Sequence, residues 1–253
     1  MTNKVRYFNY PFVLCQKKSL FITLSFLFAL SSTISSAMEI YKSNDNHAPN
    51  ATGSTIAAGL YHSLYIKKDC TLWAMGYNNY GQLGDGTTDT RSTPVKVNTD
   101  VVEVAAGNVH SLFIRKDGTL WAMGYNKYGQ LGDGTTVDRN TPVKTASNVT
   151  FVTAGVFHSL FIKDDGSLWA MGRNEDGQLG DGSSINRSRP VKVADDVVQA
   201  ACGSAHSLFL KKDGALWAMG ANYQGQLGES GNIISRSPVR IADRVVRISA
   251  GGS

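Results

Sequence analysis

The sequence predicts an all-β fold, a β-propeller of four-stranded blades, from three observations. One unit of sequence recurs every 48 residues in four successive copies, with no insertion or deletion. Each unit holds short β-branched or alternating apolar runs separated by turn residues, which is the pattern of strands. The chain has 26 glycines among 253 residues, more than the average of about 7%. Four strands in about 40–50 residues are typical of a propeller blade, and so much glycine disfavours helical repeats.

The repeat is anchored by residue types that return at the same place in every unit. A histidine opens an apolar run, a Leu-Trp pair follows, and a Gly-Gln-Leu-Gly motif and a proline come later. Because large rings bury much apolar area, we expect the Leu-Trp pairs to pack between neighbouring sheets. We expect the histidines to hydrogen-bond a neighbouring strand or loop. The positions are His62, His110, His158, His206, Trp73, Trp121, Trp169, Trp217, Pro94, Pro142, Pro190 and Pro238.

The second unit shows where the strands of a blade are expected. Asp117-Gly118 between two apolar runs is a strong hairpin signal, because glycine accepts the positive φ that the turn demands. Cys70 takes the place of that glycine in the first unit, so its turn is expected to be strained or differently built. A glycine-rich loop precedes the last strand, where a proline suits the first residue or a sheet edge. The strands are expected at residues 101–105, 110–115, 119–123 and from about 141.

The strand types are not present in equal number. The first type appears five times, near residues 54–58, 101, 149, 197 and 245, whereas the other three appear four times. The propeller predicted over residues 54–253 therefore has four 48-residue repeats plus the first strand of a fifth. The array is then a fragment of a longer protein, an open arc, or a closed four-bladed ring in which the fifth strand competes with the first. An open blade edge invites pairing with another chain, so self-association is one expectation.

The first 37 residues have the composition of a secretory signal peptide. They hold four basic residues and no acid, then an apolar run over 20–30, then serine, threonine and alanine. We expect cleavage after Ala37, with a short linker over 38–53. The apolar run is shorter than the about 20 residues of a spanning helix, so no stable membrane span is expected after cleavage. The predicted location is the periplasm, the cell surface or the extracellular space.

The export segment also accounts for the basic charge of the chain. The net charge is +5, with 25 basic and 20 acidic residues, and removal of residues 1–37 reduces it to +1. Nucleic-acid binding rests largely on basic side chains at the phosphates, so nucleic acid is not an expected partner. Cys70 and Cys202 replace small repeat residues and lack metal-ligand spacing, so we expect free thiols.

No catalytic constellation stands out in the sequence. Catalysis needs different groups that converge, whereas the repeated histidines are one group copied along the array. The stretch 85–88, Asp-Gly-Thr-Thr, lacks the alternating acidic ligands of a calcium loop and forms a turn by itself. The glycine-rich stretch 81–86 lacks the lysine of a phosphate-binding loop. We therefore expect no enzyme activity, no cofactor and no metal site.

The differences between the copies are the best guide to a partner. Tyrosine and arginine in loops at one end of a rigid sheet are typical of a protein-binding face, and the loop after each Leu-Trp strand varies in this way. The alternative is a solvated loop whose tyrosines pack on adjacent blades. A second variable set precedes each repeated histidine, with Tyr61 in the first unit and Phe157 in the third, on a rim that the sequence does not identify. The candidate partner-binding residues are Tyr77, Asn79, Tyr80, Tyr125, Lys127, Tyr128, Arg173, Glu175 and Tyr223.

The repeated motifs resemble those of the regulator of chromosome condensation repeat family. They are Ala-Gly-x-x-His-Ser-Leu, Asp-Gly-x-Leu-Trp-x-x-Gly, Asn-x-x-Gly-Gln-Leu-Gly and a downstream Pro-Val, over about residues 56–251. The resemblance implies a propeller that acts as an interaction platform. The founding member of the family exchanges nucleotide on the Ran GTPase and binds chromatin. That member inserts a β-wedge from one blade into its GTPase, and the strict 48-residue spacing leaves no room for such an element here.

Together these features predict an exported, non-enzymatic propeller scaffold that binds another protein or a surface polymer. Two alternatives remain open. One, implied by the resemblance, is a guanine-nucleotide exchange factor for a Ran-type small GTPase. The other is a lectin-like propeller that binds glycans.

Overall fold

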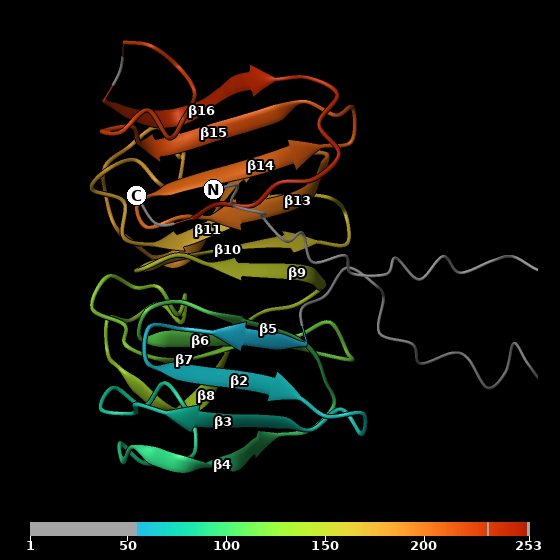
Figure 1. Ribbon diagram of the computed structural model, residues 1–253, viewed down its shortest axis with the longest axis vertical. Coiled ribbons are helices and arrows are strands. Elements are labelled where there is room, and N and C mark those ends of the chain that lie inside the picture. The colour runs from blue at the N-terminus through green and yellow to red at the C-terminus, as the bar shows by residue number, and fades with distance from the viewer. Residues whose placement is uncertain (1–54, 232, 252–253) are drawn as a thin grey trace, which may run out of the picture. The chain divides into compact units, whose positions relative to one another are not determined.

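The computed structural model describes residues 55–231 and 233–251 of the chain. These residues belong to the second of the two units into which the chain divides, Pro49–Ser253. The predicted signal peptide and the linker over 38–53 lie outside the described residues. The described residues form sixteen strands and no helix, in four antiparallel sheets of four strands each (Figure 1). The prediction of an all-β array of four-stranded blades is confirmed.

Each blade is a meander in which consecutive strands pair. The first blade contains β1 (Ile56–Ala58), β2 (His62–Ile66), β3 (Leu72–Gly76) and β4 (Arg91–Asn98). The second contains β5 (Val101–Ala106), β6 (His110–Arg115), β7 (Leu120–Gly124) and β8 (Arg139–Ala146). The third contains β9 (Val149–Ala154), β10 (His158–Lys163), β11 (Leu168–Gly172) and β12 (Arg187–Ala194). The fourth contains β13 (Val197–Cys202), β14 (His206–Lys211), β15 (Leu216–Ala221) and β16 (Ile234–Ala242).

The outermost strand of each blade is longer than the sequence predicts. In the second blade it begins at Arg139, which pairs with Gly124, rather than near residue 141. A register shift between Ala122 and Gly124 makes room for the extra residues, as a β-bulge does. Pro142 lies inside this strand, which is tolerated because the strand is at the edge of its sheet.

The hairpin between the second and third strands has the predicted turn. Gly118 has a φ of 73°, and its N–H donates to the carbonyl of Arg115 at 2.9 Å. The Asp117 carboxylate accepts hydrogen bonds from the backbone N–H and the hydroxyl of Thr119, at 3.0 and 2.6 Å. Cys70 adopts the same left-handed conformation, with a φ of 61°, so the first turn is a strained copy of the others. Cys70 and Cys202 are free thiols.

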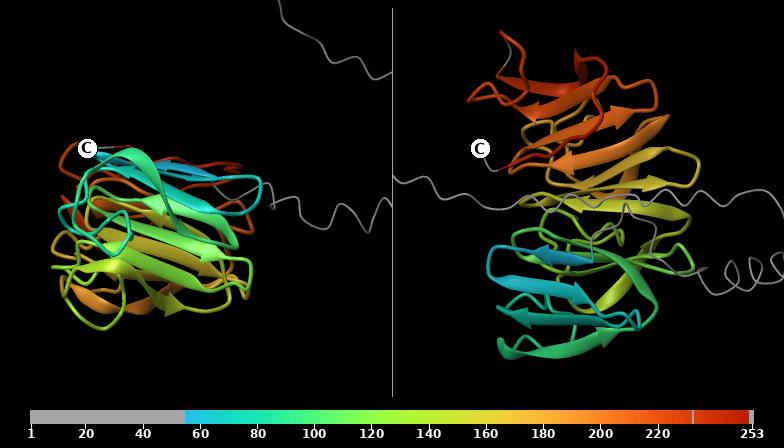
Figure 2. Two further views of the ribbon diagram at one scale, coloured as in Figure 1. Left: turned by 90° about the horizontal axis from the view of Figure 1, so that it is seen from below. Right: turned by 45° about the vertical axis from the view of Figure 1, so that its right-hand side comes forward.

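The blades follow one another in chain order (Figures 1 and 2). Neighbouring blades pack through one repeated apolar interface. In the second blade the rings of Phe113 and Trp121 stack with centroids 6.4 Å apart, and they face Leu64 and Leu72 of the first blade. The Trp121 indole N–H donates to the Thr119 hydroxyl at 2.9 Å, so its polar end is satisfied. Equivalent clusters join the second blade to the third and the third to the fourth. The Leu-Trp pairs therefore supply interface residues, as predicted.

The array is open at both ends in the part of the chain that the structure describes. The apolar clusters join neighbouring blades at three interfaces, and none joins the first blade to the fourth. After β16 the chain returns to the inner side, where the N–H of Val245 donates to the Gly214 carbonyl at 3.0 Å, just as Val197 donates to Gly166 at 2.9 Å. Residues 245–250 thus begin the inner strand of a fifth blade, although they are not assigned as a strand. The prediction of a partial or open propeller, with four repeats and the first strand of a fifth, is confirmed.

A second contact between blades joins the inner strands. A carboxylate oxygen of Glu103 accepts from the N–H of Val152 in the next blade at 3.1 Å. Gln199 makes the same contact with Ile248, accepting from its N–H at 3.2 Å and donating to its carbonyl at 3.3 Å. Glu103 is only 3% exposed, and burial raises its pKa to about 7.

We expect Glu103→Gln to remove a pH dependence from folding. Between the ordinary pKa of 4.5 and about 7, the folded chain keeps a proton that the unfolded chain has lost, so the free energy of unfolding falls as the pH rises through this range. The full effect is about 3 kcal/mol. The glutamine variant should therefore be more stable than the native chain at about pH 8, as measured by urea unfolding. Gln199→Glu is the reciprocal control, and an unchanged pH profile in both variants would contradict the assignment.

None of the residues that the structure describes forms a helix of the length and apolarity that a membrane span requires.

Candidate protein-binding rim

The repeated histidines lie buried between blades. The Nε2 of His62 is 2.8 Å from the hydroxyl oxygen of Ser111 in the next blade, and that hydroxyl donates to the carbonyl of Gln82 at 2.8 Å. Because the serine donates to the carbonyl, the histidine Nε2 carries the proton and the serine oxygen accepts it. His110 with Ser159 and His158 with Ser207 repeat the arrangement, both at 2.9 Å. The histidines therefore link each blade to the next.

Burial keeps these histidines neutral. It lowers the pKa of His62 to about 4 and, together with the charges of neighbouring histidines, those of His110 and His158 to about 3. His110 and His158 are 0% exposed, so no substrate can reach their rings without separating the blades. The serine was not predicted as the partner of the histidine. Both residues recur at the same 48-residue interval, so their spacing does not show which of them meet.

The Asp-Gly loops are organised by a buried asparagine. Asn78 accepts from the N–H of Leu83 at 2.9 Å and donates to the Asp85 carboxylate at 3.2 Å. Asp85 also accepts from the Thr87 hydroxyl at 2.7 Å and pairs with Arg91 at 2.6 Å. The carboxylate oxygens of Asp85 are thus used in hydrogen bonds that hold its own loop against Arg91. In the described ranges, no group of three or more acidic, histidine or cysteine side chains is placed to hold a metal ion.

The variable loops of the first two blades bring their tyrosines into one continuous line. The ring centroids of Tyr77 and Tyr80 are 6.1 Å apart, those of Tyr80 and Tyr125 4.9 Å, and those of Tyr125 and Tyr128 6.3 Å. The contact between Tyr80 and Tyr125 crosses from the first blade to the second. Aromatic pairs prefer such edge-to-face arrangements, so these rings are held in place by one another.

The second variable set lies on the same rim and extends this line. Tyr61 contacts Tyr77 with centroids 6.3 Å apart, and Phe157 of the third blade contacts Tyr125 and Tyr128 at 5.8 and 5.3 Å. The sequence did not identify this rim, although the hairpin register implies it: the N–H of Tyr77 donates to the Tyr61 carbonyl at 2.8 Å. We call the set the aromatic ridge. It consists of Tyr61, Tyr77, Tyr80, Tyr125, Tyr128 and Phe157.

A charged cluster continues the rim beyond the aromatic ridge. The guanidinium of Arg173 lies 6.0 Å from the Tyr128 ring and pairs with Glu175 at 2.8 Å and Asp176 at 3.4 Å. The Tyr223 hydroxyl donates to the Asp176 carboxylate at 2.8 Å, which carries the cluster to the fourth blade and raises the pKa of Tyr223. Asn79 and Lys127 are exposed at the loop tips between the ridge residues. The structure thus places all nine predicted residues on one rim.

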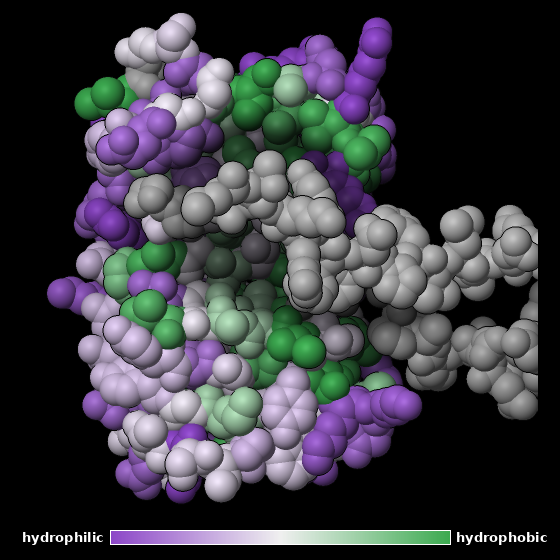
Figure 3. Space-filling view, viewed as in Figure 1, coloured by the Kyte–Doolittle hydropathy of each residue, from purple (hydrophilic) through white to green (hydrophobic). Residues whose placement is uncertain are grey.

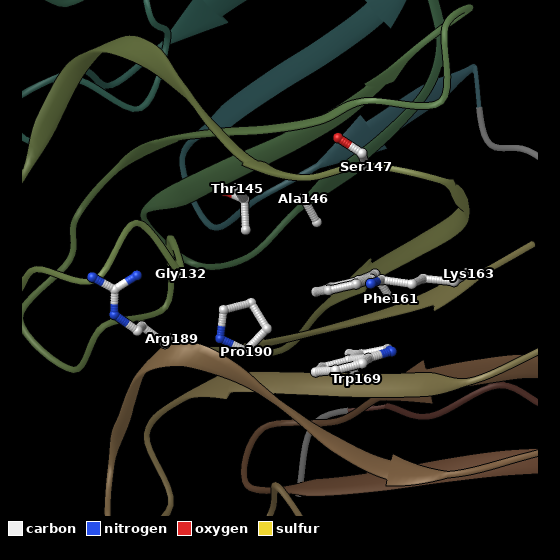
Figure 4. Close-up of a pocket in the computed structure, with 9 residues that line it drawn as sticks. All are labelled: Gly132, Thr145, Ala146, Ser147, Phe161, Lys163, Trp169, Arg189 and Pro190. Atoms are coloured by element: carbon white, nitrogen blue, oxygen red, sulfur yellow. The ribbon is translucent and has the colours of Figure 1, made fainter.

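A groove between the second and third blades was not predicted from the sequence (Figure 4). Its volume is about 320 Å³. The rings of Phe161 and Trp169 form one side, with the Lys163 ammonium 4.5 Å from the Trp169 ring centre, and Arg189 lies at the other. Thr145 stands here where the first and third blades have valine, and its hydroxyl donates to the Leu131 carbonyl at 2.6 Å. The groove is separate from the rim residues described above.

Four-stranded meanders that pack face to face with their first strands inside define a β-propeller array. The chain belongs to the RCC1-like domain family, whose model matches residues 54–253. The array is similar to human WBSCR16, at 23% identity and a TM-score of 0.70, over 80% of this chain and 57% of that one. It is also similar to Prp20p of Saccharomyces cerevisiae, at 23% identity and a TM-score of 0.67, over 78% of this chain and 53% of that one. The chain thus spans just over half the length of these proteins.

The structure of yeast RCC1 (Prp20) bound to Kap60 is a further match. Its identity is 20% and its TM-score 0.59, over 78% of this chain and 65% of that one. At these identities the likeness shows a shared fold.

Proposed function

We propose that the chain is an exported scaffold that binds a protein partner through the aromatic ridge. The observation that carries the proposal is that residues which differ between otherwise regular repeats meet in one unbroken line of ring contacts across three blades. Positions that recur in every unit serve the scaffold, through the histidines, glycines and tryptophans. The variable positions are free to encode a partner.

The ridge has the physical properties of a binding surface. Tyrosine contributes large contact area with few rotatable bonds, so little conformational entropy is lost when a partner immobilises it. The ridge rings already restrain one another, which reduces that loss further. Burial, followed by the effect of neighbouring Tyr128, raises the pKa of Tyr125, so its hydroxyl stays neutral and can donate to a partner. The adjacent charged cluster would then fix the orientation of the partner.

Two kinds of support bear on the partner and the location. The published structures of similar proteins concern the binding of Prp20p to Gsp1p and histones, and yeast RCC1 bound to Kap60, which favours a protein partner in general. Export rests on the basic, apolar and small-residue segments of residues 1–37. The near-neutral charge of the remaining chain favours a partner other than nucleic acid.

We expect replacement of Tyr77, Tyr80, Tyr125 and Tyr128 by serine to abolish partner capture. The partner would be captured with the native chain from the envelope or surroundings of the producing organism, and its affinity then measured for both chains. Loss of four aromatic contacts should weaken binding by at least about 100-fold. The phenylalanine quartet should retain most of the affinity, because it keeps the rings.

The control changes exposed residues at the opposite ends of the strands. Lys68, Lys116 and Lys212 lie on the hairpins between second and third strands, and their joint replacement by serine should leave binding unchanged. Circular dichroism should show both sets folded, because the buried clusters between the blades are unchanged, although the tyrosine quartet loses the Tyr80–Tyr125 contact at the rim. An unchanged partner list and affinity for the serine quartet would reject the ridge as the contact surface.

Guanine-nucleotide exchange on a Ran-type GTPase is the second candidate function. The likeness to Prp20p favours it, as does the family to which the chain belongs. Release of a fluorescent nucleotide from the GTPase distinguishes the two functions. Acceleration by the native chain would support exchange, and its absence would leave the scaffold function.

A further inference from the structure

The groove between the second and third blades collects residues that depart from the repeat. Arg189 stands where the other three blades have a threonine or a serine, and Thr145 stands where the first and third blades have valine. Ser147 stands where the third and fourth blades have an aspartate. All three residues line the groove. Because recurring positions serve the scaffold, departures that meet in one place indicate a site that the scaffold itself does not require.

The guanidinium of Arg189 reaches the groove by crossing from the third blade to the second. It lies so close over Gly134 that a Cβ built on this glycine would be 2.8 Å from the guanidinium carbon. At the corresponding glycines of the first and third blades, Gly86 and Gly182, the nearest atoms are a threonine methyl at 3.9 Å and a serine hydroxyl at 3.8 Å. The bare backbone at Gly134 is therefore the surface on which Arg189 rests.

The second cation of the groove is Lys163, on the side opposite Arg189 (Figure 4). Its ammonium lies 4.5 Å from the centre of the Trp169 ring, which attracts a cation but is no counterion. Asp165 acts on Lys163 through space, while its carboxylate accepts from the N–H and the hydroxyl of Ser167 at 2.8 and 2.5 Å. Within the described part of the chain, neither cation of the groove forms an ion pair.

The other blades show how such a charge is neutralised elsewhere. The aspartate at the repeat position of Ser147 pairs with a cation of its own blade, Asp195 with Lys192 at 2.7 Å and Asp243 with Arg240. The second blade has a neutral hydroxyl at this place instead. The positive charge of the groove is thus left for a ligand.

The shape of the groove distinguishes these cations from ordinary surface charges. Figure 3 shows hydrophilic side chains spread over much of the visible face, so a single basic residue does not mark a site. Here two cations lie on either side of a hollow of about 320 Å³, which is within the range of small-ligand sites. The surface between them is largely apolar, and it is formed by Ala146, Pro190 and the rings of Phe161 and Trp169.

We propose that the groove binds a small organic dicarboxylate, with one carboxylate at Arg189 and the other at Lys163. A guanidinium presents two parallel N–H groups to a carboxylate, and an ammonium acts as a point charge. The apolar surface between the cations favours a spacer of methylene groups, which gains free energy when it leaves water. The site is separate from the aromatic ridge, so it goes beyond the proposed function and is tested independently of it.

The test titrates the native chain calorimetrically with succinate, glutarate, adipate, pimelate and suberate at low ionic strength, because salt screens exposed charges. We expect one length to bind best, since both carboxylates must reach their cations at once. The half-amide of that acid keeps the spacer but loses one charge, and it should bind at least about 10-fold more weakly. The absence of binding by all five acids would overturn the proposal.

Variants at the two cations identify the site of binding. Arg189→Thr introduces the residue of the second blade, and Lys163→Gln removes the other charge; each should weaken binding of the best acid by about 10-fold or more. Lys163→Arg introduces the residue of the second blade at that position and should retain most of the affinity. Circular dichroism shows that each variant is folded.

The matched control is Lys211→Gln. Lys211 has the same repeat position as Lys163 and lies 5.5 Å from the Trp217 ring centre, but it does not line the groove. Its replacement should leave the affinity unchanged. A loss as large as that of Lys163→Gln would show a general effect of surface charge and would overturn the proposal.

Two further measurements define the ligand. Ser147→Asp places a carboxylate at the groove, as in the third blade, and should weaken binding of the dianion. The peptide Glu-Ala-Glu with both ends blocked offers two carboxylates from a protein source. It should bind no better than the best free acid, and tighter binding would overturn the assignment to a small molecule.

Discussion

Lowering the pH from about 7 to about 4 is expected to unfold the protein, because three buried histidines must then be protonated. Their pKa values are about 4 for His62 and about 3 for His110 and His158 in the folded chain, against 6.5 in the unfolded chain. Between these values the unfolded chain binds protons that the folded chain excludes. The free energy of unfolding therefore falls as the pH falls below about 6.5.

The size of this effect is set by the three histidines together. The summed shifts correspond to a loss on the order of 10 kcal/mol at the acid limit, comparable to the whole stability of many domains. Glu103 acts in the opposite direction with about 3 kcal/mol, so the histidines dominate. Each of the three rings lies at a different interface between blades, so protonation destabilises all three interfaces.

Urea unfolding from about pH 8 to about pH 4, followed by circular dichroism, checks the prediction. In the His158→Gln variant an amide N–H can still reach Ser207 but does not titrate. This variant should be less stable near neutral pH and lose less stability on acidification. Stability that is constant down to about pH 4 would show that the histidine rings are not excluded from protonation.

Gly107→Ala is expected to destabilise the fold by about 3 kcal/mol or more. A Cβ at this position would lie 2.5 Å from the carbonyl oxygen of Gly155 and would also collide with the ring of His110. Neither can move easily, since one is backbone of the next blade and the other is a buried ring that bonds to Ser159. Gly107 has no positive φ, so the whole effect comes from lack of space.

Gly118→Ala is the matched comparison, because Gly118 has a positive φ and open space around it, whereas Gly107 has neither. Its φ is 73°, but the nearest atom to an added Cβ is 3.7 Å away. The expected loss is about 1–2 kcal/mol, from backbone strain alone. Cys70 already shows that a side chain is tolerated in this turn. Urea unfolding of both variants measures the difference, and a larger loss at Gly118 than at Gly107 would contradict the close approach of the blades.

Most of the fold could be predicted because the blade is encoded locally. Strand positions follow from the alternation of residues within one unit, and the Asp117-Gly118 turn follows from its own chemistry. The start of the outermost strand could not be predicted in this way. It depends on a register shift beside Gly124, and such a bulge is decided by packing against the rest of the sheet rather than by the strand's own residues.

The candidate rim was predicted in part. The variable loops identified the four tyrosines of the first two blades, but Tyr61 and Phe157 were left on an unnamed rim. The pairing of histidine with serine was also missed. Both residues recur every 48 positions, so the sequence alone does not tell a contact within a blade from a contact with the next.

The aromatic ridge crosses from blade to blade, and this has a mechanical consequence. Tyr80 and Tyr125 belong to different blades, and Phe157 to a third. A partner that covers these rings would hold three blades at fixed angles to one another. Such a partner would therefore oppose separation of the first three blades as well as cover their rim.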